Sequence, residues 1–414
     1  MMIRSSSIRD SDSVVPLSVP LLDQMLSVEM KGAILDHTAS LITLVFSDQN
    51  LPFEITKLLL LSLITVYDKD HWISLPDGSK KSWAQWLNAI GKIFDEYIGG
   101  LLTLNILGKA LAGSKQRTLC REWSAGNHAS PLEGSSVRRK PDIVLLDNCD
   151  MNEGQIPEWK HVRALGEVTT QNYLPQRIKS TVRSKAYVAM NEQHDRRFII
   201  AISFFAESSF QLTLCDRAGI IHSPTYDIHK DPLYFLRVLT GLMFGDETVL
   251  GYDSSIRRNS DNEIETIIVN GAEYHVLRRL FSSTALRGRA TRCWHVEREG
   301  KQYVIKDSWV HMGRTTSEID ILQDIHSVQF TPTIVDGWDV AYPSREISGT
   351  GPRSAVVDST RLHRVGLDYP EARVHRRIVM QPVGETIHSF VSKKELIGAF
   401  IDIITGMSAV ILAI

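Results

Sequence analysis

Apolar residues recur along this chain in three patterns, which predict a helical start, a mixed α/β middle and a strand-rich final third. Residues 1–80 are typical of helices, and we expect an N-terminal helical segment there. Trp83, Leu87, Ile90 and Phe94 then follow one another at helical spacing. Side chains three or four residues apart lie on one face of a helix, so this stripe predicts a helix that buries one side.

Residues 81–250 alternate short apolar runs with helical stretches, a pattern typical of α/β domains. The runs that predict strands are residues 143–146, 161–169, 198–205, 210–215 and 220–222, and the stretches that predict helices are residues 177–190 and 231–242. We therefore expect one α/β domain over residues 81–250.

A polar and charged segment, residues 251–263, predicts a linker to a second domain over residues 264–391. The second domain begins with two strand-like runs joined by Asn270-Gly271, which favours a tight hairpin turn. A long polar stretch, residues 341–376, predicts an insertion, and such loops are either regulatory or disordered. The chain as a whole is therefore predicted to combine α/β and α+β architecture.

Composition argues against several classes of protein, among them nucleic-acid-binding, zinc-binding and secreted proteins. The chain has 414 residues, a formal net charge of −2 and 43% hydrophobic residues, so it can build real cores and carries no strong nucleic-acid signal. Its four cysteines form no C-x-x-C pair, which argues against a zinc site and a disulfide framework. Residues 1–20 lack the apolar core of a signal peptide. We expect an intracellular protein, cytoplasmic or nuclear.

The end of the chain, residues 392–414, predicts one further helix that is almost uncharged. Its length is close to that of a membrane span, but Asp402 near its middle would be costly in lipid. We expect no membrane association.

A glycine-containing loop and a lysine on a strand predict a phosphate site. Phosphate needs backbone N–H groups at close range, which glycine permits, and a fixed cation. Gly288 is followed by Ala290 and Thr291 in a loop, Val296 lies on the next strand, and Lys306 ends the strand after that. These five residues are our candidates for nucleotide binding. The alternative is an ordinary hairpin with a surface lysine.

Glu318 is the candidate partner of Lys306. It opens a predicted helix whose apolar residues include Ile319 and Leu322, with Thr316 or Ser317 as the expected cap. A solvated glutamate favoured by the helix dipole is the alternative interpretation.

Several motifs, in the same order, resemble the fungal-type protein kinase family, a divergent group of kinases. The resemblance extends from about residue 80 to about residue 404. The matching segments are residues 141–147, Trp159 with 166–168, Gln193 with 196–198, 215–219, 250–253, 288–309 with Glu318 and Leu322, 387–390 and 395–404.

The resemblance implies a kinase small lobe over residues 264–391, followed by the first helix of a large lobe at residues 392–414. It implies ATP and Mg²⁺ as cofactors, a nucleotide as ligand, and Ser/Thr-type phosphotransfer as the activity of the family. Met380 would lie in the hinge that meets the adenine ring.

The sequence departs from kinases in one respect. A kinase needs an H-R-D-type aspartate as the base and a D-F-G-type aspartate for Mg²⁺. Neither motif follows Lys306 in these 414 residues. We expect a chain shortened before its catalytic loop and inactive as it stands. The alternative is a pseudokinase scaffold that binds a nucleotide or an unknown protein partner.

A third hypothesis concerns the α/β domain. Asp142 and Glu167 stand where the PD-(D/E)-x-K core of restriction-endonuclease-like enzymes carries two Mg²⁺-binding carboxylates. Thr169 occupies the lysine position and cannot supply a positive charge. We therefore expect a nuclease-like scaffold with a vestigial metal pair, and keep an Mg²⁺-dependent nuclease as the alternative.

Overall fold

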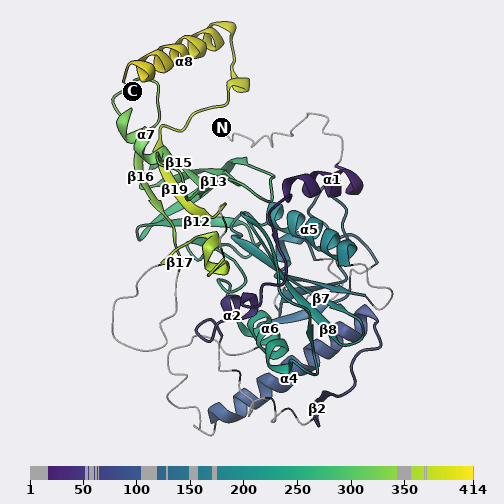
Figure 1. Cartoon of the computed structure of the whole chain (residues 1–414). Coiled ribbons are helices and arrows are strands. Elements are labelled where there is room, and N and C mark those ends of the chain that lie inside the picture. Colours follow the sequence, from purple (N-terminus) through teal and green to yellow (C-terminus); the bar gives the residue numbers. More distant parts are fainter. Residues whose placement is uncertain are drawn as a thin grey trace, which may run out of the picture.

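Two β-sheets organise the chain in the computed structural model (Figure 1). The structure describes residues 17–51, 55, 60, 63, 65–103, 119–126, 129–148, 157–169, 175–342, 356–367, 369 and 371–413. The mixed α/β composition predicted from the sequence is confirmed.

The first sheet has eight strands and mixed direction. In order across the sheet they are β1 (Ile34–Leu35), β9 (Gly219–His222), β8 (Ser209–Asp216), β7 (Phe198–Phe205), β6 (Ala164–Val168), β5 (Ile143–Asp147) and β4 (Arg121–Ser124), and β10 (Tyr226–Asp227) pairs with β8. β4, β5 and β6 form an antiparallel meander, and a helix then leads to β7, which is parallel to β6.

Helices cover both faces of this sheet (Figure 1). One face packs against α2 (Leu41–Val45), α4 (Lys80–Thr103) and α6 (Pro232–Phe244), and the other against α1 (Val19–Glu29) and α5 (Pro175–Glu192). Every residue of β7 is buried, which explains why Ser203 is its only polar residue. The short helix η2 (Trp159–His161) precedes β6. The predicted stripe on α4 lies in the core.

Residues 1–80 are not a separate helical segment. The described part includes β1, β2 (Tyr67–Asp68) and β3 (His71–Trp72), and α1 and α2 belong to the two cores of the first sheet. β1 exists because Ile34 and Leu35 pair with Ile220 and Ile221 at the sheet edge. A two-residue strand has no sequence period of its own, so only the distant partner defines it.

The second sheet has seven strands that run antiparallel to their neighbours. They are β11 (Ile256–Arg258), β12 (Ile264–Val269), β13 (Ala272–Ser282), β14 (Arg292–Arg298), β15 (Lys301–His311), β19 (Arg373–Gln381) and β16 (Thr333–Asp339). The predicted hairpin at Asn270-Gly271 is present, with φ values of 47° and 80° that fit a primed turn. α7 (Glu318–Asp324) lies between β15 and β16 in the chain and packs on β16.

Residues 251–263 are not an exposed linker. Tyr252, Asp253 and Ile256 are buried, and β11 adds a strand to the second sheet within this range. The polar composition misled the prediction because Asp253 is buried as the partner of Arg377, whose Nη2 lies 2.9 Å from an Asp253 carboxylate oxygen. A paired charge can be buried where a lone one cannot.

The predicted insertion, residues 341–376, also differs from expectation in its described part. It contains β17 (Ala341–Tyr342), β18 (Val356–Val357), the short helix η3 (Thr360–His363) and the start of β19. Arg364 pairs with Asp216 of the first sheet, and the Tyr369 hydroxyl donates to the Ala218 carbonyl at 2.7 Å. The described residues between 356 and 372 therefore attach one sheet to the other instead of forming a free loop.

The last elements are η4 (Ile387–Ser389) and α8 (Lys393–Ala413), which extends away from both sheets (Figure 1). Much of its apolar surface is exposed, while Val410 packs near α7. Among the described residues, no helix combines the length and apolarity needed to cross a membrane.

Candidate functional site

Lys306 lies in the middle of the second sheet, on β15. It stands opposite Cys293 of β14 and Ile378 of β19, so strands on both sides fix its backbone. Ile378 packs against α7, which places the Lys306 side chain on the same face as that helix. The side chain is 20% exposed, so its ammonium can reach a ligand while its stem is held.

Glu318 is the first residue of α7, and its position is set by a capping box. Ser317 accepts a hydrogen bond from the Asp320 N–H at 3.1 Å, and Asp320 accepts one from the Ser317 N–H at 2.9 Å. The Glu318 carboxylate contacts the Lys306 ammonium directly. Burial raises the pKa of Glu318, but the hydrogen bond and charge of Lys306, together with the charge of Arg289, outweigh it and lower the pKa.

Arg289 completes this group and was not anticipated from the sequence. Its guanidinium Nη2 lies 3.0 Å from the second oxygen of Glu318, so the carboxylate is bound between two cations. Within this group of three, one negative and two positive charges leave a net positive charge. Its place in the sequence, between the predicted loop residues Gly288 and Ala290, was the signal that could have predicted Arg289 beside Lys306.

The loop before β14 adopts the left-handed conformation that a glycine-rich loop requires. Gly288 has φ 122° with no atom near its missing Cβ, and Ala290 has φ 42°. Ala290 is buried, and the Thr291 carbonyl accepts a hydrogen bond from the Ser283 N–H at 2.8 Å. Burial and hydrogen bonding therefore fix the conformation of this loop.

The first sheet holds this loop in place. The Gly288 N–H donates to the Arg217 carbonyl at 2.8 Å, and the Arg287 N–H donates to the Glu29 carboxylate. Leu286 is fully buried in the core beside α5. These two loop N–H groups therefore bind the protein itself in this structure.

Two further predicted residues, Met380 and Val296, lie on opposite faces of the second sheet. Met380 stands opposite Val304 and packs with Leu322, so it is on the Lys306 face. Val296 is fully buried in the core on the opposite face, with Trp294. The structure therefore does not bring Val296 to the predicted site, because the valine is one residue later than the kinase pattern and successive strand residues point to opposite faces.

His295 takes the place that was predicted for Val296. It stands opposite Val304 on β15, on the Lys306 face. The sequence prediction thus brought together Lys306, Glu318 and Met380 and missed Arg289 and His295.

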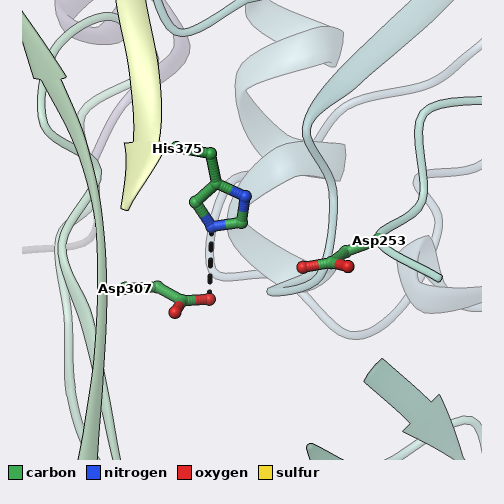
Figure 2. A group of neighbouring side chains, drawn as sticks. All are labelled: Asp253, Asp307 and His375. Atoms are coloured by element: carbon green, nitrogen blue, oxygen red, sulfur yellow. Dashed lines mark ion pairs between the residues drawn. The ribbon is translucent and has the colours of Figure 1, made fainter. Parts of the chain in front are cut away.

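A buried cluster of charges lies on the other face of β15. Among the residues that the structure describes, Asp253, Asp307 and His375 are one group close enough to hold a metal ion (Figure 2). Arg377 already occupies the carboxylates, with Nε 2.6 Å from Asp307 and Nη2 2.9 Å from Asp253. The cluster is therefore better described as an ion-pair network than as a metal centre.

His375 belongs to the same ion-pair network. Its Nε2 lies 3.3 Å from Asp307 and its Nδ1 3.1 Å from Asp358. Burial lowers its pKa, but the hydrogen bonds to both carboxylates dominate and raise the pKa to about 9. In its protonated form the imidazole donates through both nitrogens, one to each carboxylate.

The second predicted pair, Asp142 and Glu167, lies on the first sheet at adjacent strands. An Asp142 carboxylate oxygen accepts the Val168 N–H at 3.0 Å, and its other oxygen contacts the Lys80 ammonium. Glu167 is buried and contacts Lys185 of α5. The sequence predicted the two carboxylates but not the two lysines.

Comparison with known proteins identifies one family. A family model described as fungal protein kinase matches residues 140–412, more than half of the chain. The match starts just before Asp142, so it includes most of the first sheet as well as the second. Comparisons with curated proteins and with solved structures gave no match.

Proposed function

Since this chain belongs to the fungal protein kinase family, we propose that its second sheet binds the phosphates of ATP through Lys306. Kinases hold the α- and β-phosphates with a lysine on the third strand, kept in place by a glutamate on the following helix. Counting from the strand before the loop, Lys306 is on the third strand, and Glu318 opens the next helix. Their direct contact is the observation that carries the proposal.

Charge favours an anionic ligand at this place. Lys306 and Arg289 share one carboxylate, which leaves one positive charge without an acidic partner within the group. A triphosphate would attract both cations, and Mg²⁺ would enter with the nucleotide as its phosphate-bound ion. Met380, His295 and Val304 form the strand surface next to Lys306 that a base would meet.

Binding and phosphate transfer are separate questions. Transfer needs an acid that positions the hydroxyl and acids that hold Mg²⁺ beside the γ-phosphate. No H-R-D or D-F-G motif follows Lys306 in these 414 residues. We infer that these residues bind the nucleotide, and phosphate transfer would need the acids of those two motifs as well.

The test is a calorimetric titration of the chain with ATP and Mg²⁺, compared between Lys306→Met and the wild type. Hydrogen bonds to charged groups are worth about 1.5–3 kcal/mol, so we expect binding to weaken by about 10- to 100-fold. Lys301→Met is the matched control, because Lys301 is exposed at the start of the same strand, β15. If Lys306→Met binds ATP as tightly as Lys301→Met, Lys306 does not bind the phosphates.

The same preparation separates the alternatives. Transfer of labelled γ-phosphate to a protein substrate, lost in Lys306→Met, would mean a working kinase. Absence of ATP binding in a folded wild-type chain would leave the partner-binding scaffold as the remaining interpretation.

A further inference from the structure

The first sheet carries two carboxylates at neighbouring strand positions. Asp142 directly precedes β5, Glu167 lies on β6, and Ile143 pairs with Gly166 in the antiparallel register. That register places Asp142 opposite Glu167. Gly166 permits the close approach, since a Cβ there would lie 2.2 Å from Ile143.

A lysine that the local sequence motif lacks is supplied by the next helix. Thr169 occupies the motif's lysine position, but Lys185 of α5 contacts the Glu167 carboxylate. Glu167 alternates with Leu165, which belongs to the core beside α5, so the glutamate points toward that helix. Two acids and a lysine therefore meet on one face of the sheet.

A second lysine stands at the open side of this group. Lys80, the first residue of α4, contacts the Asp142 oxygen that the Val168 N–H does not use. Its side chain is 34% exposed, whereas Lys185 is 4% exposed. The exposed Lys80 side chain can move away from Asp142, whereas the buried Lys185 side chain stays beside Glu167. Without Lys80 the group carries two negative charges and one positive charge, which suits a divalent cation with oxygen ligands.

From this arrangement we propose that Asp142, Glu167 and Lys185 form a second site, which binds a divalent cation of the Mg²⁺ type and hydrolyses nucleic-acid phosphodiesters. The ammonium of Lys80 takes the place of the cation when none is bound. The site lies on the opposite sheet from Lys306 and is independent of nucleotide binding there.

Local charge indicates the class of substrate. α5 carries Arg177, Lys179, Arg183 and Lys185 before its only acid, Glu192. Lys81, Lys140 and Arg177 are exposed, and the first two are one and two residues from Lys80 and Asp142 in the chain. A phosphate backbone is the extended polyanion that such a basic border attracts, although the whole chain has a net charge of −2.

The reaction is a hydrolysis and needs only water as co-reactant. The water oxygen forms a bond to phosphorus, and the bond between phosphorus and the leaving ester oxygen breaks. The water proton passes to solvent, and the leaving oxygen takes up a proton from solvent. A bound divalent ion stabilises the charge that develops on the phosphate oxygens. Lys185 holds Glu167 in position and faces the attacked phosphate as a fixed positive charge.

The experiment begins with cation binding, measured by titration calorimetry with Mn²⁺ and with Mg²⁺ on the full chain. Asp142→Asn is expected to weaken Mn²⁺ binding by about tenfold or more, because it removes one of two anionic ligands. Lys80→Met is expected to strengthen binding, because it removes the competing ammonium. Lys92→Met is the control, since this residue lies on α4 like Lys80 but pairs with Glu122.

Cleavage is then followed with fluorescent single- and double-stranded DNA and RNA. Lys185→Met should keep cation binding and lose cleavage, while Lys306→Met should change neither. Because Glu167 would be left buried without its partner, Lys185→Arg is the second variant if Lys185→Met does not fold.

Absence of Mn²⁺ binding by the folded wild type, or equal binding in wild type, Asp142→Asn and Lys80→Met, would overturn the proposal and leave four residues in structural ion pairs. Cation binding without cleavage of any of the four nucleic acids would overturn the hydrolytic part. ATP titration of the same samples keeps this outcome separate from that of the Lys306 site.

Discussion

His375 makes the stability of this chain depend on pH in the alkaline range. The ring lies between Asp307 and Asp358, with its nitrogens 3.3 and 3.1 Å from their carboxylates, and stacks on Trp309. Burial opposes its charge, but the two carboxylates prevail and raise its pKa from 6.5 to about 9. The imidazolium therefore stabilises the folded state.

The sign follows from the raised pKa. A group that binds its proton more tightly when folded contributes its full stabilisation below the unfolded pKa, here about 6.5, and loses it as the pH rises through about 9. At about 1.36 kcal/mol for each pKa unit, the rise corresponds to about 3 kcal/mol. The ring is buried, so solvent does not reduce this value.

The assay is denaturant unfolding of the wild type and His375→Gln at pH 6 and pH 10. The difference in unfolding free energy between the two proteins should be about 3 kcal/mol larger at pH 6. His363, whose pKa burial lowers to about 4, is present in both proteins and cancels in the difference. Histidine-selective NMR adds a direct reading, because the signal that His375→Gln removes should titrate near pH 9. A difference that does not vary with pH, or a signal that titrates near 6.5, would refute the reasoning.

Two further substitutions test the packing between and within the sheets. Arg364→Met should destabilise the chain by about 3–5 kcal/mol in denaturant unfolding, because it leaves the buried Asp216 without its partner. Arg361→Met, in the short helix η3 that ends just before Arg364 but exposed, should change stability by less than about 0.5 kcal/mol, and similar losses in both would contradict the pairing. Gly166→Ala should lower the melting temperature clearly because its Cβ would meet Ile143, whereas Gly398→Ala on α8, with open space at its Cβ, should leave it unchanged or raise it. A Gly166→Ala protein as stable as the wild type would show that β5 and β6 can separate without cost.

Much of the fold could be predicted because strong local signals agreed with tertiary structure. Local sequence alone defines three elements. They are β7 by its almost wholly apolar run, α4 by its apolar stripe, and the hairpin by the turn at Asn270-Gly271. The two-residue strands were missed, since partners far away in the chain define them. The described part of the predicted insertion, residues 341–376, was misjudged because polar composition was taken as irregular structure, although Arg364 is buried against Asp216.

The candidate sites divide in the same way. Lys306 and Glu318 were predictable, because a strand and the helix that follows it are close in the chain and their order limits where their side chains can meet. Arg289 and Lys185 were not, because a loop side chain and a helix side chain reach a site from directions that only packing determines. Val296 was misplaced by one residue, which in a strand changes the face.

The sequence by itself determined the longer helices and strands, the family and the acids and lysines available for chemistry, because these depend on residue type and on spacing over a few residues. The tertiary structure alone decided which of those charges meet: Lys185 with Glu167, Arg289 with Glu318, and Arg377 with both Asp253 and Asp307. The physical reason is that a buried charge requires a partner, and the partner is chosen by the packing of distant segments, which no local pattern records.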